Sequence, residues 1–174
     1  MNTYIVLLRG INVTGKNILP MKELTLMLEE LGCKDVQTYI QSGNVVVKSK
    51  DGVDKLSKGI SKMILEKKGF EPKILVLEES ELKDAVKKCP FKADEGKTLH
   101  FFFMETTADK PNLEKLEALK TSTEKFKLSG KVFYLFAPDG IGNSKLAAVV
   151  EKCLGVSATA RNCNTVEKLL TMIG

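Results

Sequence analysis

A loop with the kinds of residue that bind negatively charged groups follows the first apolar segment of the chain. It reads R-G-I-N-V-T-G-K-N over Arg9–Asn17. The spacing G-x-x-x-x-G-K from Gly10 to Lys16 matches a nucleotide-binding P-loop, but Asn17 stands where that loop needs a magnesium-binding serine or threonine. We therefore predict a simpler anion site, made by Lys16, backbone amides and a nearby helix start. The alternative is a solvated loop that only connects two elements.

Two further segments combine glycine with polar side chains. Gln41–Asn44 reads Q-S-G-N, which is ordinary hairpin-turn chemistry but also sets two amide side chains beside a tight turn. Pro138–Lys145 reads P-D-G-I-G-N-S-K and precedes a predicted helix, which Asn143 or Ser144 can cap. This segment is either a second anion-binding loop or a turn with a cap.

Arginine is scarce in this chain, and both arginines lie in segments of this kind. Among 27 basic residues, only Arg9 and Arg161 are not lysine. A guanidinium group holds a carboxylate or phosphate with two parallel hydrogen bonds, which an ammonium group does not. Arg161 belongs to A-T-A-R-N-C-N-T, at a predicted strand-to-helix junction where Asn164 or Thr165 is expected to cap the helix. Arg161 and Asn162 are not needed for that cap and are therefore candidate ligand groups.

The sequence offers no complete catalytic set. The single histidine, His100, lies in the apolar run Leu99–Met104 and is expected to be a hydrogen-bonded residue of a sheet. The four cysteines have no C-x-x-C spacing, so we expect no metal site, and unpaired thiols are typical of a cytoplasmic protein. Lys16 and Cys163 are the conceivable reactive groups. The sequence identifies neither a reaction nor a cofactor.

Two successive β-α-β-β-α-β patterns are predicted to position these segments. The expected strands are 3–9, 36–41, 44–48 and 73–77 in the first pattern and 98–105, 126–128, 131–137 and 157–160 in the second. Amphipathic helices are expected from Pro20 to Gly32, from Val53 to Gly69, after Pro111 and up to Gly155. A last helix is expected to carry Val166, Leu169 and Leu170.

The expected fold is α+β, with two consecutive ferredoxin-like (split βαβ) subdomains that have antiparallel sheets, plus a C-terminal helix. The first subdomain is placed at 1–79 and the second at 98–174, with a connector at 80–97 whose short helix Ser80 would cap. The composition, 43% hydrophobic and 28% charged, excludes a disordered chain. No apolar run approaches the ~20 residues of a membrane helix. The apolar start of the chain is interpreted as a strand and not as a signal peptide.

The motifs, taken together, resemble a known family. R-G-I-N-x-x-G-K-N-x-x-x-M, T-Y-I-Q-S-G-N-V-V, Y-L-F-A-P-D-G-I-G-N-S-K-L and A-T-A-R-N-C-N-T-V-E-K-L are similar, in order, to motifs of the bacterial domain of unknown function 1697 family. This resemblance, over essentially the whole chain, implies two ferredoxin-like subdomains and no established activity. It marks Arg9, Gly10, Asn12, Gly15, Lys16, Gln41, Ser42, Gly43, Asn44, Ser144, Lys145, Arg161, Asn162 and Thr165. Two residues depart from the family pattern, because Thr14 stands where glycine is usual and Cys163 where tryptophan is usual.

The leading hypothesis is that the protein binds an anionic small molecule, such as a nucleotide or a phosphorylated metabolite. It requires that loops distant in the sequence converge around one hollow. The candidate ligand-binding residues are Arg9, Asn12, Lys16, Gln41, Ser42, Asn44, Arg161, Asn162 and Thr165, with Ser144 and Lys145 as a secondary anion loop.

Two alternatives remain open at the level of the sequence. RNA-recognition modules share the β-α-β-β-α-β order and stack bases on sheet aromatics. In the second pattern, Tyr134 and Phe136 are expected on one face of the sheet and Phe133 on the other, although a packed aromatic core would explain the same residues. The net charge of +5 permits RNA binding without requiring it. The third hypothesis is a protein-interaction module without a small-molecule site.

Overall fold

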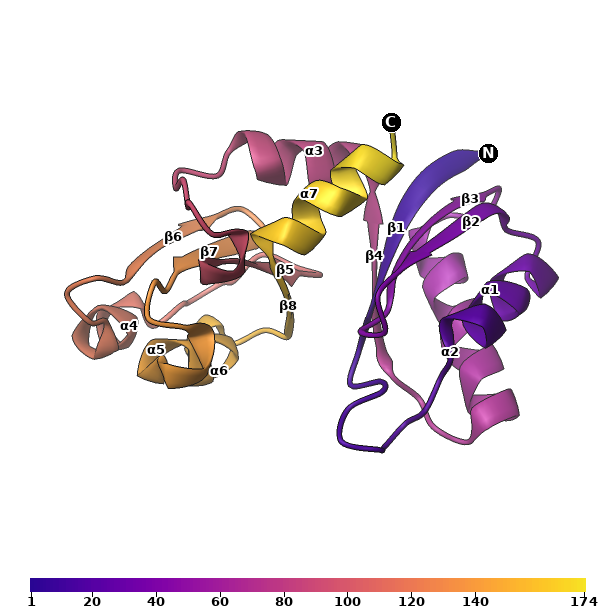
Figure 1. Ribbon diagram of the computed structural model, residues 1–174, viewed down its shortest axis with the longest axis horizontal. Coiled ribbons are helices and arrows are strands. Elements are labelled where there is room, and N and C mark those ends of the chain that lie inside the picture. The colour runs from indigo at the N-terminus through magenta and orange to yellow at the C-terminus, as the bar shows by residue number, and fades with distance from the viewer. The chain divides into compact units, whose positions relative to one another are not determined.

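The computed structural model describes residues 1–174, and the chain divides into two compact units. Unit 1 is Met1–Asp84 with Lys168–Gly174, and unit 2 is Ala85–Glu167. Each unit contains one four-stranded antiparallel sheet (Figure 1). The protein is therefore a mixed α+β protein, as the sequence predicts.

The sheet of unit 1 has the strand order β2-β3-β1-β4. Its strands are β1 (Asn2–Arg9), β2 (Lys34–Tyr39), β3 (Asn44–Ser49) and β4 (Lys73–Glu78). The central strand β1 is buried continuously from Tyr4 to Leu8. Such a continuous apolar run is typical of a strand that is covered on both faces. The edge strand β2 is mostly polar and more exposed.

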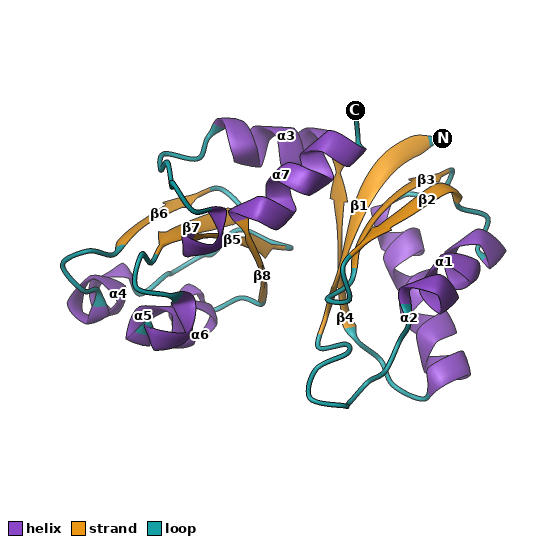
Figure 2. Cartoon of the chain, in the orientation of Figure 1, coloured by secondary structure: helices purple, strands orange, loops and turns teal.

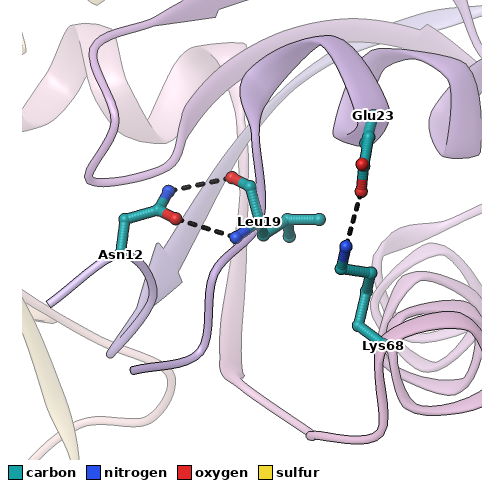
Figure 3. Close-up of polar contacts among 4 residues, drawn as sticks. All are labelled: Asn12, Leu19, Glu23 and Lys68. Atoms are coloured by element: carbon teal, nitrogen blue, oxygen red, sulfur yellow. Dashed lines mark hydrogen bonds and ion pairs between the residues drawn. The ribbon is translucent and has the colours of Figure 1, made fainter. Parts of the chain in front are cut away.

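Two helices cover one face of this sheet, α1 (Met21–Glu30) and α2 (Val53–Lys68) (Figure 2). Their apolar sides are Leu24 and Leu28 on α1 and Leu56, Ile60 and Ile64 on α2, all in one core with alternate residues of β1. At the surface, the ammonium group of Lys68 lies 2.7 Å from Glu23 (Figure 3). Lys67 pairs with Glu30, so both ion pairs join α2 to α1. Exposed pairs of this kind contribute about 0–1 kcal/mol each.

The helix ends of unit 1 follow the sequence prediction at the C-terminal sides and differ at the N-terminal sides. Gly32 and Gly69 have φ of +88° and +79°, so both glycines take the left-handed conformation that ends a helix. Pro20 is the residue before α1 and not its first residue. The predicted cap of the third helix is wrong, because α3 (Glu79–Lys87) begins directly after β4 and contains Ser80. Its first turn is closed instead by Glu81, whose carboxylate accepts from the backbone N–H of Glu78.

The sheet of unit 2 repeats the same strand order, β6-β7-β5-β8. Its strands are β5 (Leu99–Met104), β6 (Lys125–Ser129), β7 (Val132–Phe136) and β8 (Ala158–Asn162). One face lies under α4 (Leu113–Leu119), α5 (Lys145–Ala148) and α6 (Val150–Leu154) (Figure 1). Short 3₁₀ turns occupy Gly96–Thr98 and Ile141–Asn143. The core under the helices includes Phe102, Phe133, Leu135, Leu146 and Leu154.

Three predictions about the end of the chain need correction. The helix expected up to Gly155 is interrupted at Val149, whose φ of −117° separates α5 from α6. Strand β8 extends to Asn162, so that Arg161 lies inside the strand and not in a loop. The last helix, α7 (Cys163–Met172), therefore begins earlier than expected, and neither Asn164 nor Thr165 caps it. Asn162 does, since its side-chain oxygen accepts from the backbone N–H of Thr165 at 3.0 Å.

His100 differs from the expectation of a hydrogen-bonded sheet residue. It lies opposite Leu135 on β7 and Asn162 on β8, and only 8% of it is exposed. Its Nδ1 atom is buried without a hydrogen-bond partner. Burial also lowers the pKa of His100 below its usual value, so the ring is neutral at pH 7. No helix of the structure has the length and apolar character needed to cross a bilayer.

Candidate functional site

The first two predicted polar segments lie at the same end of the unit 1 sheet. Strand β1 ends at Arg9, which is paired with Lys73 at the start of β4, and Leu7 is paired with Asn44 at the start of β3. The loop that follows β1 and the turn that precedes β3 are therefore neighbours. The turn also contacts β1, because the backbone N–H of Leu8 donates to the carbonyl of Gly43 at 2.8 Å. We call residues 9–19 together with residues 39–44 the loop platform.

The loop after β1 is a small hairpin of its own. The backbone N–H of Lys16 donates to the carbonyl of Val13 at 2.9 Å, and that of Asn12 donates to the carbonyl of Asn17 at 3.0 Å. Thr14 and Gly15, at the tip, have φ of +50° and +73°, which is the pattern of a type I′ turn. These amides are engaged inside the hairpin. These two amides are therefore not available to an anion, whereas the exposed side chain of Lys16 is.

The side chain of Asn12 ties the hairpin to its surroundings. Its Nδ2 donates to the carbonyl of Leu19 and its Oδ1 accepts from the backbone N–H of Leu19, each at 2.8 Å (Figure 3). Its Nδ2 also donates to the carbonyl of Gln41 at 2.8 Å. These bonds join three segments, namely the hairpin, the residues that lead into α1 and the turn before β3. Both N–H donors of Asn12 are engaged inside the protein, so this residue positions the platform.

The Q-S-G-N segment also has a structural explanation. Asn44 is fully buried, and its Nδ2 donates to the carbonyl of Tyr39 and to the hydroxyl of Ser42, each at 3.0 Å. Gly43 has a φ of +91°, and a Cβ at this position would come within 2.8 Å of the Cβ of Leu8 and 2.9 Å of the Cδ1 of Ile11. The segment thus forms a tight turn that is pressed onto β1. Gln41 is exposed, and within this segment its side-chain amide is the polar group left for a ligand.

Thr14 offers a test of how far the hairpin is strained. A β-branched residue at a φ of +50° is strained by about 1–2 kcal/mol relative to glycine. Because glycine also loses more entropy on folding, we expect Thr14→Gly to raise the free energy of unfolding by about 0.5–1 kcal/mol in urea titrations. Thr38→Gly is the matched control, because Thr38 lies in extended β2 and its replacement should lower stability. A loss of stability in both variants would contradict the strain argument.

The remaining charged groups of the platform are Arg9 and Lys16. Arg9 is half-buried at the end of β1 and makes polar contacts within the chain. Lys16 is exposed beside the hairpin tip and takes part in no ion pair. Lys73, exposed on β4, stands directly opposite Arg9 in the sheet. Two cationic side chains are therefore in register at this end of the sheet, and both interact with other groups of the chain.

The other predicted residues belong to unit 2, where two of them have clear structural roles. Ser144 caps α5, because its hydroxyl accepts from the backbone N–H of Ala147 at 3.1 Å, and Asn162 caps α7 as described above. Arg161 donates from Nη1 to the carbonyl of Ala160 at 2.9 Å. Thr165 is buried, and Lys145 is exposed. Capping explains Ser144 and Asn162 without a ligand, and sequence reasoning assigned the second cap to the wrong residues.

The aromatic residues of the second sheet are not available for stacking with bases. Phe101, Phe103 and Tyr134 lie on the face opposite the core of α4–α6, and each is only 1–2% exposed. Their rings pack on one another, with 5.0 Å between the centroids of Phe101 and Tyr134. The hydroxyl of Tyr134 donates to the carbonyl of Ala85 at 2.6 Å, and burial raises its pKa to about 12. This burial argues against the RNA-binding alternative.

The thiol of Cys163 is not activated. Burial first, and then the neighbouring carboxylate of Glu167, raise its pKa to about 11. A thiol with this pKa is protonated at pH 7, whereas the nucleophile in cysteine chemistry is the thiolate. Cys33 and Cys89 also have a pKa raised by burial, and all four cysteines are free thiols.

Comparisons with known proteins agree with this description of the fold. The model of a family described as "Protein of unknown function (DUF1697)" matches residues 1–134. The solved structure of a conserved bacterial protein, SP0830 from Streptococcus pneumoniae, is similar with a TM-score of 0.79 and 24% sequence identity, over 99% of each chain. At this identity the similarity concerns the fold alone. No protein with a curated description matches the chain.

Proposed function

This chain belongs to the DUF1697 family of proteins of unknown function, and from its own residues we propose that it binds an anionic small molecule at the loop platform. The ligand class is that of nucleotides and phosphorylated metabolites. The observation that supports the proposal is the set of bonds made by Asn12, which fixes the hairpin that carries Lys16 against the turn that carries Gln41. A rigid support of this kind reduces the entropy that ligand binding would otherwise cost.

The charge of the platform favours an anion. Lys16 presents an exposed ammonium group that takes part in no ion pair, at the same end of the sheet as the basic residues Arg9 and Lys73. Gln41 supplies an exposed amide that can donate to a phosphate oxygen. The net charge of +5 adds a general attraction for negatively charged molecules.

We expect Lys16→Gln to weaken binding of the anionic ligand about tenfold or more, because one charge-assisted hydrogen bond is lost. A thermal-shift screen of nucleotides and sugar phosphates identifies the ligand, since a molecule that binds only the folded protein raises its melting temperature. Isothermal titration then compares the variants. Arg9→Lys keeps the positive charge but removes the guanidinium group, which can form two parallel hydrogen bonds. This variant tests the second basic residue.

The matched control is Lys58→Gln. Lys58 is an exposed residue of α2, so its loss removes the same charge without touching the platform. Equal affinities of the native protein, Lys16→Gln and Arg9→Lys for every anion that binds would contradict the proposal. A screen in which no anion raises the melting temperature would contradict it as well.

We also propose that the two units are a duplicated ferredoxin-like fold. The support is the shared strand order, in which the first strand of each unit lies between the third and fourth strands of that unit. The subdomains at 1–79 and 98–174, joined by residues 80–97, are part of this proposal. Four free thiols favour a reducing compartment such as the cytoplasm.

A further inference from the structure

The loop platform has an apolar component that the proposed anion site does not use. Val13, Ile18 and Ile40 are 54%, 52% and 50% exposed. They are three of the seven large apolar residues that the protein exposes, and the other four are dispersed. Those four are Met1 at the chain start, Leu26 on α1, Leu65 on α2 and Leu113 on α4.

The bonds made by Asn12 hold together the backbone segments that carry these three residues. Val13 follows Asn12 directly, and Ile18 precedes Leu19, whose backbone N–H and carbonyl both bond to Asn12. Ile40 precedes Gln41, whose carbonyl accepts from Asn12. Each apolar side chain is therefore one residue from a group at the centre of the platform, on the same support as Lys16.

Ile40 is an unusual residue for its position. Its φ of +49° lies in the left-handed region, where β-branched residues are rare and asparagine or glycine are favoured. Because half of its side chain is exposed, burial in the folded protein compensates only part of this strain. A strained and incompletely buried isoleucine is typical of a contact surface.

We infer that the anion bound at the platform is a nucleotide, whose base contacts Val13, Ile18 and Ile40 while Lys16 holds the phosphate. This inference rests on the proposed function and narrows its ligand class. Ligand sites combine apolar contacts with a few polar groups, as this platform does. A sugar phosphate matches it less well, because its hydroxyl groups would lose water against aliphatic side chains without gaining hydrogen bonds.

The test compares ligands that differ only in the base. Ribose 5-phosphate and the four common ribonucleoside monophosphates are titrated into the full chain by calorimetry. We expect at least one nucleotide to bind about tenfold tighter than ribose 5-phosphate, as contact of a base with two or three aliphatic side chains predicts. Equal affinity of ribose 5-phosphate and all four nucleotides would overturn the inference.

A substitution of Ile40 and a matched control test whether the base contacts this side chain. Ile40→Asn keeps a residue that tolerates the left-handed backbone and removes the apolar surface, so we expect it to weaken nucleotide binding about fivefold and to leave ribose 5-phosphate unchanged. Leu26→Asn, at a residue that is 58% exposed on α1, is the control and should change neither affinity. An equal effect of Ile40→Asn on both ligands would indicate a distorted platform and would overturn the inference.

The two proposals fail in distinguishable ways. If no ligand binds in a manner that depends on Lys16, the anion site itself is refuted. If ribose 5-phosphate binds in that manner and no base improves its affinity, the anion site stands and only the nucleotide assignment is refuted. Binding to vesicles of anionic lipid that Ile40→Asn abolishes, without any binding of nucleotides, would assign the apolar side chains to a membrane surface instead.

Discussion

Gly43→Ala is expected to lower the free energy of unfolding by about 3 kcal/mol or more. The added methyl group would come within 2.8 Å of the Cβ of Leu8 and within 2.9 Å of the Cδ1 of Ile11, distances that real Cβ atoms do not adopt. Overpacking in a core costs about 1–3 kcal/mol. The φ of +91° adds about 1–2 kcal/mol of backbone strain for any residue with a Cβ. Urea unfolding of both proteins measures the difference.

A second glycine separates the steric contribution from the backbone contribution. Gly15 has a φ of +73°, and no atom lies within 4 Å of a Cβ built on it. Gly15→Ala should therefore cost only about 1–2 kcal/mol. In addition, Ile11→Val removes the Cδ1 atom that the new methyl group meets, so it should restore part of the stability lost in Gly43→Ala. Equal losses for the two glycine variants would show that the close approach to β1 is unimportant.

Asn12→Ala is expected to cost about 3 kcal/mol, the second largest effect. It removes all three hydrogen bonds of the side chain. Leu19 is fully buried, so its N–H and its carbonyl would lose their partner without access to water, at about 1–3 kcal/mol for each group left unsatisfied. Alanine would also be strained at the φ of +53°. Relaxation of the loop is expected to recover part of this total.

Two other substitutions at the same position separate these effects. Asn12→Gly tolerates the backbone conformation but makes none of the bonds, so it should be about 1 kcal/mol more stable than Asn12→Ala. Asn12→Asp keeps the acceptor for the N–H of Leu19 but sets a second oxygen against two carbonyl oxygens, so it should also destabilise the protein. If Asn12→Ala unfolds within about 0.5 kcal/mol of the native protein, the bonds of Asn12 do not hold the platform.

Much of the fold could be predicted because its signals are local. Continuous apolar residues identify β1, and Gly32 and Gly69 mark two helix ends because a left-handed residue is needed there. The interruption at Val149 could not be predicted, since nothing in its neighbourhood of apolar residues breaks a helix. The extension of β8 through Arg161 and Asn162 depends on pairing with β5, which is a distant segment. The cap of α7 was assigned incorrectly for the same reason.

The sequence predicts which segments form the candidate site but not what each residue does within them. The types of residue predict ligand-binding segments around Lys16 and Gln41, and the structure brings these two segments together. The sequence could not show that Asn12, Ser42 and Asn44 direct their polar atoms inward, because their partners include backbone carbonyls that no motif reveals. Nor could it show that Ile18 and Ile40 remain exposed, since an isolated isoleucine usually predicts a buried position.

The bonds that shape the loop platform join uncharged groups, whereas α1 and α2 are linked at the surface by ion pairs such as Lys68 with Glu23. Dissolved electrolyte screens exposed charges beyond about 10 Å at 0.1 M ionic strength but has little effect on amide hydrogen bonds. The arrangement of Lys16 and Gln41 should therefore persist across a wide range of ionic strength. Any fall in affinity along that range then reports the number of charges on the ligand and not a loosening of the protein.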